Sequence, residues 1–489
     1  MSSEPAQPAH AADPVELLDP AEPAAPTAAA SRRFRRRLLG TIAVLAAAAV
    51  SLAFAGVVQG PRLSEASVDV ERVTRLADGR LVLALNQPIA RVDGDVRVEP
   101  AEPAELTIDG RALVVEFAEP LPYDTEYTVT VDGVVGEAQP TAVTVEHRFT
   151  TTDAPVYTLA RRSPAGQTDV ILRSSFGERT PEVVLEATRL QSFAHAGDAV
   201  VAVAVEDDDT NTLRVAGIDE TTQTMGLPEP GIVRSIGGST THPLIAFVHD
   251  GVTLPGGAEP AYRETLFTLD VSGVAAAPEP VLGLDGEPLR VMDWRFVPGT
   301  TSLVVQDLDG ALFVVDALGL TPPTPLGSAA ELRGLIPGSR LLVVADPDRG
   351  RIFDLETGEE APNELPIAEL PEQAYPGKVE QLDASGAHLL SVLLTGDDGA
   401  GGVTTESLLA RVDAEGTSLR YATGEGSRLL DYCVAPNGRS AAVETVADGA
   451  ASDGYPHAPS YVERLTTVVD LETGDVVLTQ SGGSSDWCR

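Results

Sequence analysis

The sequence has little positive charge and few aromatic residues. Its 34 lysines and arginines stand against 73 aspartates and glutamates, which leaves a formal net charge of −39. Such a charge repels phosphate backbones, so we expect no nucleic acid partner. Only one of the cations is a lysine, Lys378. Aromatic residues make up 4% of the chain, which weakens the case for a platform on which sugars stack.

Cysteine is also scarce, because Cys433 and Cys488 are the only two. Two cysteines without clustered histidines supply too few ligands for a metal centre. The seven histidines show no metal-binding spacing, although His195, His242 and His388 fall in equivalent turns of a repeat described below. We therefore expect no metal site and no cofactor.

The chain contains no catalytic signature of a known type. It has no G-x-S-x-G elbow, no S-x-x-K set and no phosphate-binding glycine loop between a strand and a helix. The acidic turn that begins at Asp207 starts like a calcium loop, but Thr212 and Ile218 stand where that loop needs glycine and glutamate. Hairpin turns favour aspartate and glycine in any case.

The first sixty residues predict a tail and a membrane anchor. Residues 1–31 hold six prolines, five acids and no lysine or arginine, which predicts a disordered cytoplasmic tail. Residues 32–60 then begin with five arginines within six positions and continue into Leu38–Val58, 21 residues without a charge. That length reaches across the roughly 30 Å of a bilayer core. Arginines on the N-terminal side predict a single-pass anchor in the cell membrane, with the bulk of the chain outside the cytoplasm.

Two other interpretations of this segment stay open. Ala53-Phe54-Ala55 offers a small-x-small site at which a signal peptide would be cleaved. A buried helix of a soluble protein is the third possibility. Both the anchor and the signal peptide export the rest of the chain.

Residues 64–152 predict a small β-sandwich. Seven segments alternate apolar and polar residues, and turns such as Asp109-Gly110 separate most of them. Seven short strands in about ninety residues are typical of an immunoglobulin-like sandwich. The predicted strands are Ser67–Val73, Arg80–Asn86, Asp95–Glu99, Glu105–Ile108, Arg111–Phe117, Thr125–Val131 and Thr144–Thr150.

Three segments of this region carry a family resemblance. Leu83–Ile89 (LALNQPI), Leu121–Val131 (LPYDTEYTVTV) and His147–Thr151 (HRFTT) resemble the opening, middle and closing strands of bacterial Ig-like domains of the S-layer-protein type. The resemblance implies a spacer or adhesion module without catalysis. It also implies that Tyr127 is a core or corner tyrosine.

Residues 155–489 contain a weak repeat typical of a β-propeller. A short apolar strand, a tight turn and a strongly apolar strand recur from residues 190, 233, 291, 332, 379 and 429, at spacings of 41 to 58 residues. That spacing is the length of one four-stranded blade. Residues 156–188 and Ser484–Arg489 are left over, and together they predict a further blade closed by both ends of the region. Seven blades are favoured, with six or eight as alternatives.

The turn Ala435–Arg439 (APNGR) resembles the S-P-D-G-x turn of TolB-like and WD40-like propellers. The regular Trp-Asp and Gly-His markers of WD40 repeats are absent. The composition, rich in alanine, aspartate and arginine with almost no lysine, resembles that of actinobacterial proteins. The expected fold class is therefore all-β, with an N-terminal transmembrane helix, an Ig-like sandwich and a propeller.

The repeat register places the two cysteines at matching positions in innermost strands of neighbouring blades. We expect a disulfide between Cys433 and Cys488, with two buried free thiols as the alternative. An aspartate followed by an aromatic residue recurs at three such positions, where side chains would line the central channel and could supply a glycosidase-like acid and base. Packing between blades is the alternative role for these pairs. The candidate channel-lining residues are Asp293, Trp294, Asp431, Tyr432, Asp486 and Trp487.

The sequence as a whole favours a membrane-anchored extracytoplasmic binding or scaffold protein over an enzyme. The propeller would bind an envelope protein or glycan whose identity the sequence does not reveal. The alternative is an exported propeller hydrolase or lyase that acts on cell-envelope polymers. A third reading is a sensor that signals through the cytoplasmic tail, although the tail carries no recognisable motif.

Overall fold

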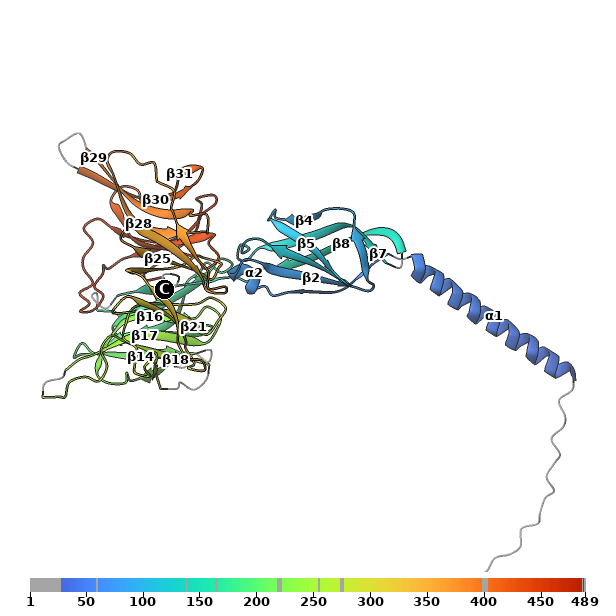
Figure 1. Ribbon diagram of the computed structural model, residues 1–489, viewed down its shortest axis with the longest axis horizontal. Coiled ribbons are helices and arrows are strands. Elements are labelled where there is room, and N and C mark those ends of the chain that lie inside the picture. The colour runs from blue at the N-terminus through green and yellow to red at the C-terminus, as the bar shows by residue number, and fades with distance from the viewer. Residues whose placement is uncertain are drawn as a thin grey trace, which may run out of the picture.

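A helix, a small sandwich and a larger body of consecutive sheets follow one another along the chain (Figure 1). This is a computed structural model, and it describes residues 28–58, 60–137, 139–162, 166–217, 222–253, 256–272, 277–397, 403–485 and 487. The predicted cytoplasmic tail lies outside the described residues up to residue 27. Strands dominate every described part of the chain after α1, so the all-β prediction is confirmed.

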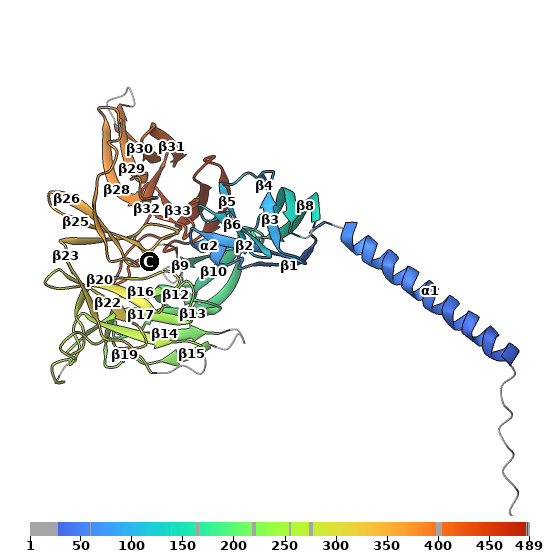
Figure 2. The same ribbon diagram turned by 45° about the vertical axis from the view of Figure 1, so that its right-hand side comes forward.

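Helix α1 (Ala28–Val58) projects from the end of the sandwich that faces away from the larger body (Figures 1 and 2). Its described apolar side chains, those of residues 34–50, are exposed, including Leu39 at 63% and Val44 at 68%. Among the described residues, no helix combines the length and the apolarity that a bilayer crossing requires. The span predicted over Leu38–Val58 includes residues 51–58, whose side chains lie outside the described ones, and it stays a prediction.

Residues 63–150 form two antiparallel sheets around one apolar core. One sheet has the order β1-β2-β6-β5, and in the other β7 pairs with β3, β4 and β8. Every second side chain of β2 and β6 is buried, and the fully buried members of the core include Leu83, Leu113, Phe117 and Tyr127. The strands are β1 (Leu63–Val68), β2 (Gly79–Leu85), β3 (Ile89–Val92), β4 (Val96–Glu99), β5 (Ala104–Asp109), β6 (Ala112–Phe117), β7 (Glu126–Gly136) and β8 (Gln139–Thr150).

Two details of this sandwich differ from the sequence prediction. The strand predicted over Ser67–Val73 ends at Val68, and the short helix α2 (Arg72–Arg75) follows. The cause is Asp69, whose carboxylate accepts a hydrogen bond from the Arg72 N–H at 3.0 Å and so starts a turn. The alternation did not predict β3, because only its first residue, Ile89, is buried.

The described residues from 155 onward form seven consecutive antiparallel sheets, which we call the propeller body. Each of the six predicted repeat starts lies in the first strand of a four-stranded sheet. The three-stranded first sheet contains β9 (Pro155–Ala160), β10 (Asp169–Ser175) and β11 (Glu182–Ala187). The next three sheets contain β12 (Leu190–Ala196), β13 (Ala199–Val205), β14 (Asn211–Ala216) and β15 (Thr222–Met225); β16 (Gly231–Gly238), β17 (Leu244–Gly251), β18 (Thr265–Asp270) and β19 (Glu279–Pro280); and β20 (Val291–Phe296), β21 (Ser302–Asp307), β22 (Ala311–Asp316) and β23 (Thr324–Ser328).

The last three sheets repeat the same simple order, in which each strand pairs with its neighbour in the chain. They contain β24 (Glu331–Leu335), β25 (Leu341–Asp346), β26 (Arg349–Asp354) and β27 (Glu360–Asn363); β28 (Ala374–Gln381), β29 (His388–Asp397), β30 (Val403–Asp413) and β31 (Gly416–Ala422); and β32 (Ser427–Val434), β33 (Ser440–Ala447), β34 (Leu465–Asp470) and β35 (Val476–Ser481).

The last sheet of the body contacts the first, which closes the series. Leu159 of β9 and Gly483 exchange two backbone hydrogen bonds, at 2.9 and 3.1 Å. The Gln480 side chain also donates to the Val156 carbonyl at 3.1 Å. Gly483 therefore lies on the open side of the three-stranded sheet, where a first strand stands in the other six. Among the described residues, this contact covers part of the β9 edge that would otherwise be free.

Candidate functional site

The pair Asp293 and Trp294 joins neighbouring sheets. Trp294 is 6% exposed, and its indole N–H donates to Ser235 Oγ in the preceding sheet at 3.1 Å. The Asp293 carboxylate accepts the Trp294 backbone N–H at 2.8 Å and pairs with Arg295. Trp294 therefore packs between two sheets. The carboxylate of Asp293 already accepts hydrogen bonds from residues of its own strand.

Asp431 and Tyr432 repeat this arrangement at the equivalent position of β32, three sheets later in the chain. Tyr432 is fully buried, and its hydroxyl lies 2.8 Å from the Lys378 carbonyl of the preceding sheet. The only lysine of the chain, Lys378, reaches back and donates to Asp431 Oδ1 at 2.9 Å. Burial, followed by the charges of Glu380 and Asp431, raises the pKa of Tyr432 well above its usual range. This pair also clamps two sheets together.

The third pair and the cysteines lie partly beyond what the structure describes. Asp486 and Cys488 are outside the described residues. Trp487 stacks on Phe176 with ring centroids 6.2 Å apart, and Cys433 is buried, with 1% of its surface exposed. The predicted disulfide between Cys433 and Cys488 stays a prediction.

A cavity of about 1190 Å³ lies where the first strands of several sheets converge, and we call it the chamber. Tyr157 of β9, Ser192 of β12, Ile236 of β16 and Leu430 of β32 contribute to its wall, and Arg75 of α2 contributes from the sandwich. Its volume slightly exceeds that of most small-molecule pockets. Of the predicted channel residues, Asp431 and Trp487 line the chamber and Asp293, Trp294 and Tyr432 do not.

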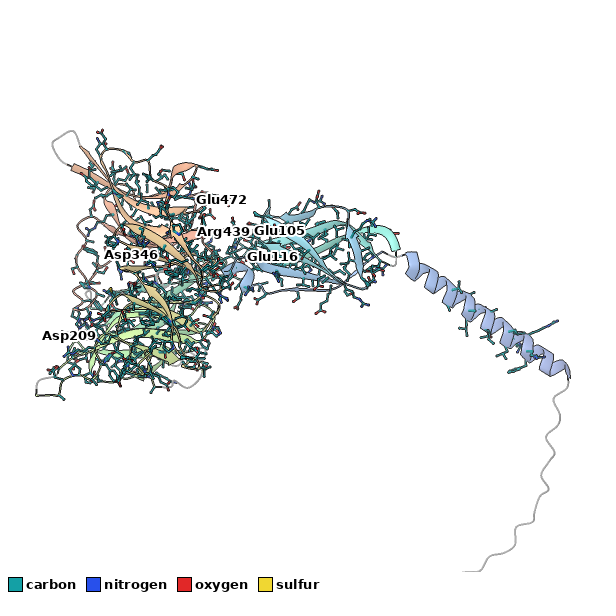
Figure 3. All side chains as sticks on the ribbon, in the orientation of Figure 1. Glu105, Glu116, Asp209, Asp346, Arg439 and Glu472 are labelled. Carbon is teal, nitrogen blue, oxygen red and sulfur yellow. The ribbon has the colours of Figure 1, made fainter. Side chains whose placement is uncertain are left out.

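The sandwich covers one end of the chamber through a contact that we call the junction. Arg439, in the turn between β32 and β33, pairs with Glu102 at 2.6 Å and donates to the Pro120 carbonyl at 3.0 Å. Figure 3 shows Arg439 on the side of the propeller body that faces the sandwich. Gly338 packs directly against Pro120 at this contact. Any residue with a side chain would clash there, because its Cβ would lie 2.5 Å from Pro120. The sandwich is thus held by turns of the propeller body.

Residues 448–464, which connect β33 to β34, cover the opposite end, and we call them the floor loop. His457 Nε2 of this loop lies 3.1 Å from the carbonyl of Asp209, in the turn between β13 and β14. Figure 3 places Asp209 on the side of the propeller body that faces away from the sandwich. The Tyr455 hydroxyl donates to the carboxylate of Asp169, the first residue of β10. The loop therefore runs beneath the chamber from the last sheet to the second.

Two buried ion pairs flank the inner surface of the chamber. Arg161 pairs with Asp453 of the floor loop at 2.5 Å, and the two side chains are 3% and 0% exposed. Arg464 pairs with Glu444 at 2.6 Å, with side chains 5% and 11% exposed. Burial, followed by the positive charge of Arg464, lowers the pKa of Arg161.

Sequence reasoning did not find these arginines. Arg161 and Arg464 belong to no motif, and each lies beside a strand where a solvent-exposed cation is the ordinary expectation. Their charge partners are distant in the chain or lie in an irregular loop, as with Arg161 and Asp453. Only the closed arrangement of sheets shows that both arginines border one cavity.

The histidines and acidic turns form no metal centre within the described residues. His195 and His242 line the chamber, whereas His388 lies elsewhere, with Nδ1 2.9 Å from the Gly386 carbonyl. The carboxylate of Asp208 accepts both the N–H and the hydroxyl of Thr210. That acidic turn therefore uses its carboxylate to shape its own backbone.

Comparisons with known proteins bear on the fold at most. No protein-family model and no curated protein matches the chain. Solved structures that it resembles include TolB from Acinetobacter baumannii, at 13% identity and TM-score 0.32, covering 68% of this chain and 80% of that one. A protein of unknown function from Bacteroides thetaiotaomicron gives 12% identity and TM-score 0.33, covering 79% and 95%. The tricorn protease gives 12% and 0.33, covering 84% of this chain and 48% of that one. These likenesses carry no argument about function.

Proposed function

We propose that the protein is an extracytoplasmic, membrane-anchored binding protein whose chamber receives part of a protein or glycan partner. In this proposal α1 anchors the chain, the sandwich is an immunoglobulin-like spacer and the propeller body has seven blades. The chamber is the observation that carries the proposal. A space of about 1190 Å³ with both polar and aromatic walls suits an extended polymer segment better than a single small metabolite.

Support for the anchor comes from the sequence and from the place of α1. Leu38–Val58 contains no charged residue and follows five arginines. Apolar side chains of α1 such as Ile42 and Leu45 are exposed, and an apolar surface of that kind calls for a covering environment. Because α1 leaves the sandwich at the end away from the propeller body (Figure 1), an anchor there would hold the chamber at a distance from the membrane.

The junction supports a role for the sandwich as a fixed spacer. Glu102 is 8% exposed in its ion pair with Arg439, and the Ala77 N–H donates to the Gly338 carbonyl at 2.9 Å. A contact with a nearly buried carboxylate and a backbone hydrogen bond resists rotation more than a flexible linker does. The spacer would therefore also set the orientation of the chamber.

Two of the carboxylates in the chamber are already engaged. Asp431 pairs with Lys378 and Glu444 pairs with Arg464. An acid and base pair for glycoside hydrolysis needs one carboxyl group held protonated and another free to accept a proton. These two residues therefore support binding more than hydrolysis, which was the alternative from the sequence.

Site-specific photo-crosslinking in whole cells of the source organism tests the proposal. Tyr461 lines the chamber, and Tyr375 on β28 is 60% exposed outside it. Replacing either tyrosine with the photoreactive residue p-benzoylphenylalanine gives a matched pair of variants. We expect an envelope protein or glycan adduct from position 461 and none from position 375. An adduct from position 375 alone, or from neither position, would contradict binding in the chamber.

A further inference from the structure

The two buried arginines of the chamber have hydrogen-bond donors left over. Arg464 gives Nη1 to Glu444 and to Ser484, while its Nη2 is buried and has no acceptor among the described residues. Arg161 gives Nη1 to Asp453 and Nη2 to the Gln191 carbonyl, while its Nε has none. Both residues line the chamber.

Buried donors of this kind are uncommon. Nearly all buried polar groups in folded proteins have a partner, and a guanidinium group offers five N–H donors in one plane. The oxygens of Glu444 accept from Arg464 Nη1 and from the Ser484 N–H at 2.7 Å, and neither of them accepts from Arg464 Nη2. Each of these two donors therefore needs an acceptor from outside the described residues.

The local charge restricts what that acceptor can be. Arg161 and Arg464 balance Asp453 and Glu444, so the four groups together are neutral. A ligand with a single negative charge adds one charge to this set. A phosphate group close to −2 would add more charge beside the two existing carboxylates. The planar guanidinium also matches the two oxygens of a carboxylate.

We infer that the chamber holds a carboxylate group of its ligand at Arg464 and Arg161. The inference rests on the proposed function and adds the ligand chemistry. The hydroxyl groups of Ser484 and Ser485, which also line the chamber beside Arg464, complete the polar surroundings of that carboxylate. Peptides with a free C-terminus and sugar acids both carry the required group.

Calorimetric titration of the full-length protein with two matched pairs of probes tests this inference. One pair is N-acetyl-trialanine with a free carboxylate and its C-terminal amide. The other is glucuronic acid and glucose. We expect at least one acid to bind about tenfold or more tightly than its neutral counterpart, as a charge-assisted hydrogen bond implies. The pair that shows this preference identifies a peptide or a sugar as the source of the carboxylate.

Arginine variants assign the preference to the site. Arg464→Gln should remove it, whereas Arg333→Gln on β24, 42% exposed and outside the chamber, should keep it. Because Arg464→Gln leaves Glu444 buried without its cation, the double variant Arg464→Gln, Glu444→Gln serves as a neutral replacement of the pair. Circular dichroism confirms that each variant is folded.

The inference is overturned if each acid binds no better than its neutral counterpart at millimolar concentration. It is also overturned if folded Arg464→Gln keeps the preference for the acid. Either result leaves the proposed function standing when the adduct from position 461 is found. Loss of that adduct, by contrast, removes the proposed function whatever the probes show.

Discussion

The sandwich and the propeller body differ in how many polar and charged side chains they bury. In the described part of the chain from β1 to Thr151, the buried polar residues are Thr74 and Thr151, and the one charged side chain named above that is nearly buried there is Glu102 at the junction. The propeller body buries whole charged groups, such as Arg161, Asp169 and Asp453. Two sheets packed face to face fill the space between them with apolar side chains. Sheets arranged around an axis leave a central space, and polar side chains with partners can line it.

This difference shows where the buried charged groups of the molecule lie. Charged groups cost free energy when buried, so they persist where each finds a partner. Every buried charge named above is paired or hydrogen-bonded, and those at the chamber come from separate sheets and the floor loop. In the proposed function the sandwich sets the position of the chamber, and the propeller body supplies most of the surface that a ligand would contact.

The prediction with the largest expected effect concerns the independence of the two regions. It removes a core side chain from the sandwich and leaves the propeller body unchanged. Phe117→Ala should lower the free energy of unfolding of the sandwich by about 3–5 kcal/mol, because it empties a fully buried site. Trp294 lies between two sheets of the propeller body, whereas Trp487 packs beside Tyr123 at the sandwich, so the fluorescence of Trp294 in a Trp487→Phe background reports on the propeller body. Circular dichroism reports on both regions. We expect an early transition by circular dichroism that tryptophan fluorescence does not follow.

The control for this experiment is Ile108→Ala, since Ile108 is 43% exposed in the same sandwich. It should change the free energy of unfolding by about 0.5 kcal/mol or less. If tryptophan fluorescence shifts together with circular dichroism in Phe117→Ala, the two regions unfold as one unit and the comparison breaks.

A second test concerns closure of the propeller body. If Cys433 and Cys488 are bonded, reduction should lower the free energy of unfolding by about 2–4 kcal/mol. The reason is that the bond restricts the conformational freedom of the unfolded chain. The fluorescence transition should shift on reduction, and the double variant Cys433→Ala, Cys488→Ala should show no such shift. Mass spectrometry of an unreduced digest should find one linked peptide pair. Two separate peptides with free thiols would contradict the bond.

A third test targets the junction. Glu102→Gln should weaken the contact between the two regions by about 1–3 kcal/mol, since it removes a nearly buried partner of Arg439. Glu119 also approaches Arg439, at 3.4 Å, but is 65% exposed, so Glu119→Gln is the matched control with an effect within about 1 kcal/mol. Limited proteolysis between residues 118 and 125 measures the loosening. Equal cleavage of both variants would contradict the assigned role of Glu102.

The smallest expected effect is a pH dependence specific to the propeller body. His249 is fully buried, and neither ring nitrogen has a hydrogen-bond partner among the described residues. Burial lowers its pKa below the ordinary 6.5, although Glu229 and Asp250 oppose the shift. The unfolded chain therefore binds a proton below pH 6.5 that the native state resists, and stability should fall as the pH drops from 7 to 5.

The effect should be about 1.4 kcal/mol for each unit by which the pKa is lowered. His249→Gln should flatten the decline in the fluorescence melting temperature over this pH range. His147→Gln in the sandwich is the control and should leave the decline unchanged. An unaltered pH profile in His249→Gln would show that another group is responsible.

Much of the architecture follows from periodicity in the sequence. Alternation over Gly79–Leu85 and Ala112–Phe117 places every second side chain in a core, and such a pattern is legible without the fold. The repeat starts found in the sequence mark the first strands of six sheets. The α2 helix escaped prediction because one side chain, Asp69, ended a strand that alternation would have continued.

The candidate site was predictable only in part. The recurring pairs at Asp293 and Asp431 were visible in the sequence, but their partners Ser235 and Lys378 lie in neighbouring sheets. These two pairs consequently join sheets, and of their four described residues Asp431 alone borders the chamber. No local pattern distinguishes an aspartate that faces a cavity from one that closes an ion pair.

What the sequence determined by itself is the strand content, the order of the regions and the repeat, because these depend on residues close together in the chain. The tertiary structure alone decided which charges are buried and which of them meet. Arg161 and Asp453 lie 292 positions apart, and their contact exists because closure of the body brings the floor loop beneath the first sheet. Long-range contacts of this kind depend on how whole sheets pack, and that information is spread over the entire chain.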